Sequence, residues 1–289
     1  MSSRQILKLM TAFYLLVFFT YLFGPLAIMG VTAFNTPSYP QAYPFEGFTW
    51  HWFEVLSQDK DVLYGLQKSI QIGIFVVLLS VPLGLAGALV MQQINRRARG
   101  LYYLVVVSPV LTPGVIIGIS TVIFWRDFTT QTGMRFLYDG TVLTVLGQSS
   151  FIAAYCMLII LARLQRFDRG LEEAALDLGA SHTQVFFHVL LPFLRPAMLS
   201  AGVLAFLSSF ENYNTTTFAI LADKTLTTVL AGRVRQGTTP ALSALAVTII
   251  AVTVLGAIVY EVLKRREDAR REAGLRAVAA LESVEGITA

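Results

Sequence analysis

The chain has 289 residues, of which 55% are hydrophobic and only 14% are charged, whereas about a quarter of the residues in an average soluble protein are charged. The mean hydropathy is +0.64, and long uncharged apolar blocks alternate with short charged segments. This layout argues against a water-soluble globule and favours a protein that crosses a membrane several times. The formal net charge of +4 lies in short clusters between the blocks, so we expect no nucleic-acid partner.

Six apolar blocks are long enough for a membrane-spanning helix, because a bilayer core about 30 Å thick needs roughly 20 residues of helix. None shows the strict alternation of a barrel strand. The sequence therefore predicts an all-α polytopic membrane protein, with a transmembrane domain over residues 1–263 and a cytoplasmic tail over residues 264–289. The predicted spans are about Leu9–Phe34, Ser69–Met91, Leu101–Trp125, Thr141–Ala162, Ala197–Leu221 and Pro240–Tyr260.

The basic residues predict which way the spans face. If the N-terminus is inside, most of the 22 Lys and Arg residues lie in the inner segments. Cytoplasmic loops carry such an excess. Both termini are therefore predicted in the cytoplasm, together with the segment from about Arg163 to Pro196.

The outer loop after the first span contains Trp50, Trp52 and Phe53 near the expected water boundary. Aromatic side chains with an apolar body and a polar end favour that interface. A short interfacial helix that anchors the loop explains them better than contact with a substrate.

The inner segment between the fourth and fifth spans has a helical pattern at both ends. Asp168 can cap a first helix, and Gly179 can supply the left-handed residue that ends it. The apolar stripe of that helix, at intervals of three and four, consists of Leu171, Ala174, Ala175 and Leu178.

A second helix follows directly. Ser181 and Gln184 form the S-x-x-Q capping box that starts it, and Pro192 and Pro196 mark where we expect it to stop. Its apolar residues are Val185, Phe186, Val189 and Leu190. The pattern predicts two helices joined by a glycine turn on the inner face of the membrane, where a partner protein would cover the small and apolar side chains. Alternatively, the segment packs only on its own spans or lies among lipid headgroups.

The run Glu173-Ala174-Ala175, three residues, Gly179, nine residues, Val189, one residue, Leu191-Pro192 resembles the EAA loop of permease subunits of ATP-binding-cassette (ABC) importers. Its one departure is Val189, where isoleucine is usual. The resemblance covers most of the chain and is nearest to permeases of spermidine/putrescine-type importers. Further matching residues are Phe48-Thr49, Trp52-Phe53, Ser108-Pro109 and Ser209-Phe210-Glu211.

The resemblance implies a bacterial inner-membrane protein that pairs with a homologous permease, two ATPase subunits and an extracytoplasmic substrate-binding protein. It implies that a coupling loop over about residues 165–196 docks on the ATPase. The docking residues carried over from the motif are Glu173, Ala174, Ala175, Gly179 and Leu191. The chain would be a transport subunit and not an enzyme, with ATP and Mg²⁺ bound by the partner ATPase and no cofactor bound by this chain. Its sequence has no G-x-x-x-x-G-K-[ST] phosphate-binding loop.

Glu211 is the one ionisable residue near the centre of a predicted span. A charge there costs about 2.5 to 3.5 kcal/mol on insertion scales, so the carboxylate should face a wet cavity or a partner. In a continuous helix, Ser208, Asn212 and Thr215 share one side with Glu211, and we predict that these four residues line the substrate pathway. The alternative is a hydrogen-bonded clamp between helices, with a protonated Glu211.

The predicted substrate is a polyamine or another small cationic or amino-acid-like solute. Polyamine permeases usually carry acidic residues in this region, whereas Glu211 is followed here by Asn212. The alternative function is a proton-coupled secondary transporter that uses Glu211. We predict no metal site, since His182 and His188 lack the i, i+4 spacing of a helical metal pair.

Overall fold

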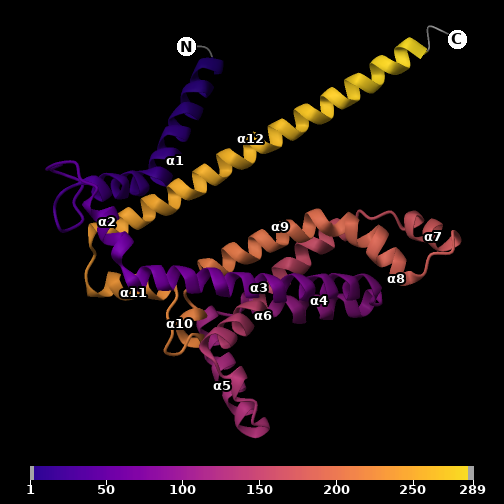
Figure 1. The fold of residues 1–289 in the computed structure, drawn as a ribbon, viewed down its shortest axis with the longest axis horizontal. Coiled ribbons are helices and arrows are strands. Elements are labelled where there is room, and N and C mark those ends of the chain that lie inside the picture. The colour runs from indigo at the N-terminus through magenta and orange to yellow at the C-terminus, as the bar shows by residue number, and fades with distance from the viewer. Residues whose placement is uncertain (1–2, 286–289) are drawn as a thin grey trace. The chain divides into compact units, whose positions relative to one another are not determined.

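A computed structural model describes the backbone of residues 3–285 and the side chains of residues 4–262, 264 and 265. This part of the chain is helical, and its only β-type pairing is an isolated antiparallel bridge between Asn35 and Phe48. The helices fall into two compact units, residues 1–58 with 237–289, and residues 59–236 (Figure 1). The all-α prediction is confirmed, while the predicted boundary at residue 263 stays a prediction.

Within residues 3–285, the first unit contains the helices α1 (Ser3–Phe34), α2 (His51–Gln58) and α12 (Pro240–Glu285). Near the end of α1, the buried Thr32 hydroxyl donates a hydrogen bond of 2.9 Å to Ser243 of α12. The predicted short helix is present as α2, and the indole N–H of Trp52 donates to the Asn35 carbonyl at 2.7 Å. The last predicted span continues beyond Tyr260 as one helix, α12, to Glu285.

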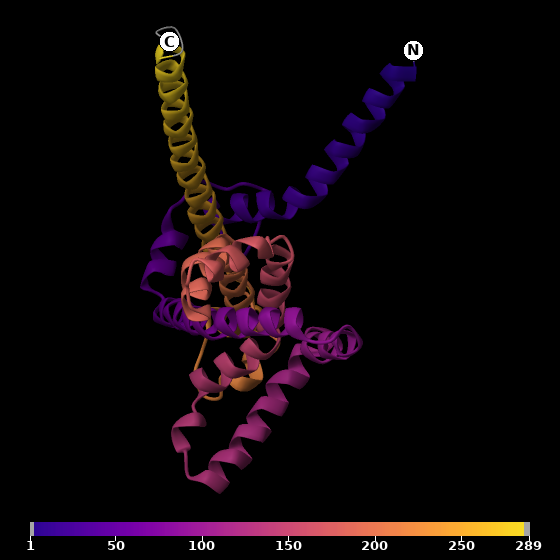
Figure 2. The ribbon, with the colours of Figure 1, turned by 90° about the vertical axis from the view of Figure 1, so that its right-hand side faces the viewer.

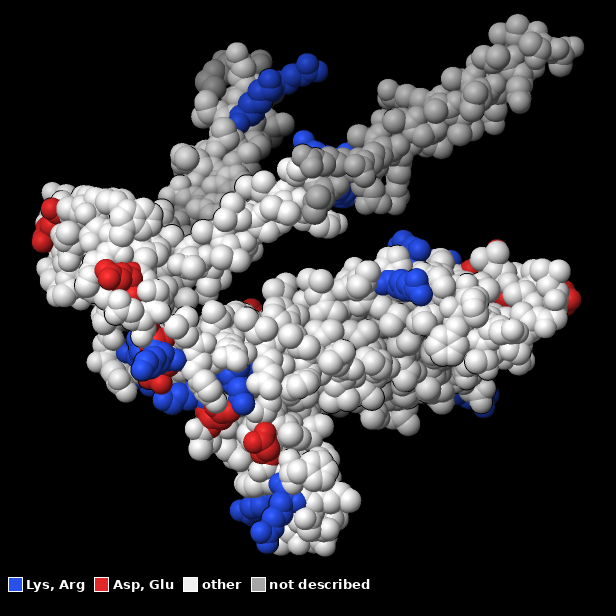
Figure 3. Space-filling view, viewed as in Figure 1, with Lys and Arg blue, Asp and Glu red and all other residues white. Residues whose placement is uncertain are grey.

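The second unit is built on α3 (Lys60–Gln93), α6 (Gly140–Leu164) and α9 (Leu191–Phe210), which lie side by side in both views (Figures 1 and 2). Their shared core consists of buried aliphatic side chains, including Ile72, Val76, Ile152, Ile160, Ala201 and Ala205. Burying such faces against one another is what stabilises helices in contact. In Figure 3, uncharged surface separates the charged side chains near α11 from those near α7.

The shorter elements of this unit connect or extend the three long helices. They are α4 (Arg96–Leu111), α5 (Gly114–Thr132), η1 (Arg135–Leu137), α7 (Arg169–Asp177), α8 (His182–Val185), η2 (Phe186–Leu190), α10 (Thr216–Ala219) and α11 (Leu226–Gln236).

The predicted third span is present as two helices, α4 and α5, rather than one. The chain bends by 100° between α4 and α5. Pro113 explains the position of the bend, because proline disfavours helical geometry in the residue before it, and Thr112 is extended, with φ −84° and ψ 132°. Five of the described helical segments are individually long and apolar enough to span a membrane, and the bent pair makes six if it counts as one span.

The predicted fifth span is wrong at both ends. Its helix begins earlier, since α8, η2 and α9 form one helical segment over His182–Phe210. It also ends earlier, at Phe210, and is followed by a non-helical stretch before α10. The predicted stop at Pro192 does not occur, because the π-helical turn η2 lies just before it and the Leu191 N–H bonds to the Phe186 carbonyl five residues back.

Candidate functional site

The inner loop forms the predicted helix, glycine turn and helix, and each cap is in place. The Asp168 carboxylate accepts a hydrogen bond of 2.9 Å from the Gly170 N–H at the start of α7. Gly179 has a left-handed backbone, with φ +87°. Ser181 and Gln184 form the reciprocal capping box, in which the Ser181 N–H donates to the Gln184 side-chain oxygen at 2.8 Å. Local hydrogen bonds therefore define the shape of this loop.

The loop presents apolar groups that its own chain leaves uncovered. Leu178 is 90% exposed and Phe187 is 54% exposed, while Phe186, also predicted to be exposed, is half-buried. Between the two helices lies a groove of about 410 Å³, lined in part by Ala175, Gly179 and Val189. Large exposed apolar patches are typical of surfaces that contact another protein or a membrane.

The five residues predicted to dock an ATPase lie along this loop and its exit. Glu173, Ala174 and Gly179 are exposed, and Ala175 and Leu191 are half-buried. They therefore lie on one capped structure, although Leu191 is already the first residue of α9. Their docking role stays a prediction.

The four residues predicted to line a pathway do not share one helical face, because the helix ends before three of them. Glu211 caps α9 and is exposed, and its N–H donates to the Leu207 carbonyl at 3.1 Å. Ser208 remains on α9 and is half-buried. The prediction that these four residues share one face of a helix is therefore wrong, whereas their role in the substrate pathway stays a prediction.

Asn212 and Thr215 contribute to the structure of the break. The Asn212 side-chain oxygen accepts hydrogen bonds from the backbone N–H groups of Thr215 and Thr216, at 3.1 and 3.3 Å. Thr215 is fully buried. A Cβ added to Gly118 of α5 would lie 2.6 Å from the Thr215 carbonyl oxygen, so the break packs closely against α5.

Glu211 continues an exposed apolar row on α9. Leu199, Val203 and Leu207 recur at intervals of four and are 72%, 62% and 56% exposed. Glu211 follows Leu207 by four residues, and its carboxylate has no hydrogen bond or ion pair with any other described residue. The same row borders an apolar groove of about 710 Å³ between α3 and α9.

Sequence reasoning missed a buried amide that faces the break from α6. Gln148 is 1% exposed and hydrogen-bonds to Ser209 and Thr216. The available signal was a glutamine inside the fourth apolar block, which a search for ionisable residues passes over.

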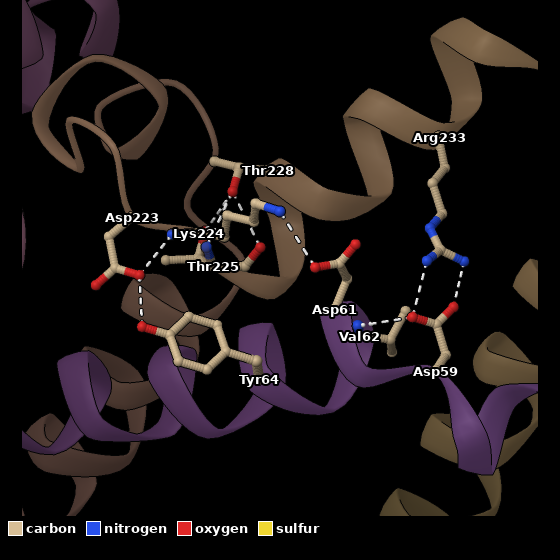
Figure 4. Close-up of polar contacts among 9 residues, drawn as sticks. All are labelled: Asp59, Asp61, Val62, Tyr64, Asp223, Lys224, Thr225, Thr228 and Arg233. Carbon is tan, nitrogen blue, oxygen red and sulfur yellow. Dashed lines mark hydrogen bonds and ion pairs between the residues drawn. The ribbon is translucent and has the colours of Figure 1, made fainter.

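Sequence reasoning also missed an ion-pair network near α11, at the opposite end of the unit from the inner loop (Figure 1). Figure 4 shows most of its contacts. Asp59 caps α3 and pairs with Arg233 of α11, and Asp61 pairs with Lys224 at 3.1 Å. Asp223 accepts from Lys68 and from the Tyr64 hydroxyl, at 2.8 and 2.7 Å. A polar cavity of about 540 Å³ lies beside these residues.

The pKa of the Asp223 carboxyl is set by two opposing effects. Partial burial raises it, but the hydrogen bonds from Lys68 and Tyr64 outweigh burial and hold the pKa below its usual value. The carboxyl is therefore ionised at neutral pH and joins the loop before α11 to the start of α3.

Comparisons with known proteins agree with the architecture. Residues 80–268 match the family described as binding-protein-dependent transport system inner membrane component. The chain is 30% identical over 260 residues to the putrescine transport system permease protein PotI of Escherichia coli (strain K12), with 89% of this chain and 91% of the relative covered. It is 24% identical to the spermidine/putrescine transport system permease protein PotC of Haemophilus influenzae, covering 88% of this chain and 96% of the relative.

A solved structure shares the fold. It is a bacterial alginate ABC transporter in complex with an alginate pentasaccharide-bound periplasmic protein, and the TM-score is 0.66 at 18% sequence identity. The match covers 89% of this chain and 92% of that one.

Proposed function

Because the chain belongs to the family of binding-protein-dependent transport system inner membrane components, and is thus a permease subunit of an ABC importer, we propose that it forms half of a substrate pathway driven by a separate ATPase. The proposed assembly contains this chain, a homologous permease, two ATPase subunits that bind ATP and Mg²⁺, and an extracytoplasmic binding protein. In a bacterial inner membrane, both termini and the capped inner loop would face the cytoplasm.

The exposed loop between α7 and α8 is the observation that supports ATPase docking. Its caps hold the shape without outside help, and Leu178 is nevertheless 90% exposed. A rigid loop with an uncovered apolar face suits a surface that transmits movement between proteins. The proposed contact residues are Glu173, Ala174, Ala175, Gly179 and Leu191.

The exposed row on α9 supports pairing with a second permease. Leu199, Val203 and Leu207 could face lipid, but Glu211 extends the same row, and an ionised carboxylate in contact with lipid tails is costly. The end of the row that carries Glu211 should therefore face water or protein. A second permease packed beside α9 would enclose Glu211 in a wet pathway.

We propose a polyamine or a similar small cation as the substrate. Relatives named for putrescine and spermidine/putrescine transport support this class, and the unpaired carboxylate of Glu211 supplies one negative charge. Ser208 would add a polar group beside it. Asn212 would act through the backbone N–H groups that its side chain binds, and Thr215 through its packing against α5.

Docking is tested by co-purification of the tagged chain with its ATPase. Leu178→Glu should abolish co-purification, because a charge replaces an exposed apolar contact. Phe136→Glu is the matched control, since Phe136 is 71% exposed but lies in η1, far along the chain from the loop. Equal ATPase recovery with Leu178→Glu and the unmodified chain would contradict the docking proposal.

Substrate class is tested by uptake of labelled putrescine into proteoliposomes that contain the full importer. Glu211→Gln should slow uptake about tenfold by removing the attraction for a cation, with ATPase binding unchanged. Glu54→Gln, an exposed change on α2, should have no effect. Unaltered uptake with Glu211→Gln would remove Glu211 from the pathway, and uptake by the purified chain alone, driven by a pH gradient without ATP, would replace the importer with a secondary transporter.

A further inference from the structure

One side chain of α6 connects the two sides of the break that carries Glu211. The Gln148 side-chain oxygen accepts a hydrogen bond of 2.5 Å from the hydroxyl of Ser209, in the last turn of α9. The Gln148 side-chain nitrogen donates a hydrogen bond of 2.8 Å to the hydroxyl of Thr216, the first residue of α10. Glu211 lies between these two attachment points.

The hydrogen bonds form a chain with one direction. The Thr216 hydroxyl donates its hydrogen to the Asn212 carbonyl at 2.7 Å, which leaves its oxygen free to accept from Gln148. If the Gln148 amide were flipped, its oxygen would accept the hydrogen of the Thr216 hydroxyl. That hydrogen could then no longer be donated to the Asn212 carbonyl. All three side chains, Gln148, Ser209 and Thr216, are buried, so each hydrogen bond that is lost leaves an unpaired polar group.

The position of Glu211 depends on the backbone of the break, because no described residue hydrogen-bonds to its side chain. Its carboxylate has no partner among the described residues, and its backbone N–H follows the last turn of α9. The direction in which the carboxylate projects is therefore set by where α9 ends and how the chain turns toward α10. The Gln148 amide ties these two points together, in addition to the hydrogen bonds of the Asn212 side chain within the break.

We propose that Gln148 is a positioning residue for cation translocation, which holds the break so that the Glu211 carboxylate projects into the pathway. This inference rests on the pathway role of Glu211 proposed above. Gln148 does not contact the substrate; it acts through Glu211.

The test uses Gln148→Leu, which keeps the approximate volume and removes both hydrogen bonds. In proteoliposomes with the complete importer and putrescine-saturated binding protein, we expect putrescine uptake to fall about tenfold. ATP hydrolysis should fall less, so fewer putrescine molecules should enter per ATP. Ser149→Ala is the matched control, because Ser149 neighbours Gln148, is buried, and has a hydroxyl without a hydrogen-bond partner among the described residues; it should leave uptake unchanged.

A double-mutant cycle with Glu211→Gln separates positioning from a general effect on folding. If Gln148 acts through Glu211, then Gln148→Leu should cause no further loss once Glu211 is Gln. Two results would overturn the inference and leave the proposed pathway intact. In the first, the uptake loss of the double variant equals the product of the two single-variant losses. In the second, Gln148→Leu takes up putrescine normally while Glu211→Gln is slow. Normal uptake with Glu211→Gln alone would instead refute both the inference and the proposed pathway. If Gln148→Leu fails to assemble, Ser209→Ala, which removes only the 2.5 Å hydrogen bond, takes its place in the same cycle.

Discussion

The left-handed turn at Gly179 allows a quantitative test of the docking loop. Gly179 has φ +87°, and a Cβ added there would meet nothing within 4 Å. The cost of Gly179→Ala is therefore the cost of the left-handed backbone alone, about 1–2 kcal/mol. Because Gly179 is exposed and no neighbouring group packs against it, an alanine there can relax out of the left-handed conformation when no ATPase is present, and docking must then restore it.

The expected consequence is a weaker complex. An energy of 1–2 kcal/mol corresponds to a factor of about 5–30, which is the largest loss of ATPase affinity that we expect for Gly179→Ala. Asn tolerates the left-handed conformation better than Ala does, so Gly179→Asn should lose less.

The affinity can be measured by titrating the purified ATPase onto the detergent-solubilised importer core. Gly100→Ala is the matched control, because Gly100 lies in helix α4 and an added Cβ there also meets nothing within 4 Å. Unchanged affinity with Gly179→Ala, or an equal loss with Gly100→Ala, would refute the role of this turn in docking.

Two further predictions concern stability. Gly118→Ala should destabilise the protein by about 1–3 kcal/mol, because the new Cβ would lie 2.6 Å from the Thr215 carbonyl oxygen; thermal unfolding in detergent measures this, and Gly24→Ala, with nothing within 4 Å, is the control. Because the pKa of the Asp223 carboxyl is lowered in the folded state, its ionised form stabilises the protein. This stabilisation is fully present at pH values above the ordinary carboxyl pKa of 3.8, and it is lost as the pH falls through the lower pKa of the folded state. Asp223→Asn should therefore reduce the loss of melting temperature between about pH 7 and about pH 3, and an unchanged pH dependence would contradict this.

The inner loop was predictable because its structure is encoded locally. Asp168, Gly179, Ser181 and Gln184 act on backbone groups within a few residues of themselves, and the structure confirms each cap. Such local hydrogen bonds can be predicted from the neighbouring residues, without knowing the rest of the fold. The continuation past Pro192 was missed because a π-helical turn has no comparably strong sequence signal.

The break after Phe210 was missed for the opposite reason. Hydropathy averages over about 20 residues, and the segment from Ala197 to Leu221 is apolar enough to pass as one span. What makes the break possible is tertiary, since Gln148 of α6 and Gly118 of α5 satisfy and enclose it. A helix can end within an apolar block when neighbouring helices accept its freed polar groups.

The loop and the break lie at the two ends of one helical segment. His182–Phe210 has 29 residues, and the 20 residues of α9 within it make about 30 Å of helix at 1.5 Å per residue. The segment begins directly after the Ser181 cap of the loop and ends at the residue before Glu211. A force applied to the loop can therefore reach the hydrogen bonds of Gln148 along one continuous helical backbone, which changes direction between α8 and α9 (Figure 1). The π-helical turn η2 lies near the loop end of the segment. Bending at η2 therefore does not interrupt α9, which would move as one helix together with α3 and α6, the helices packed against it.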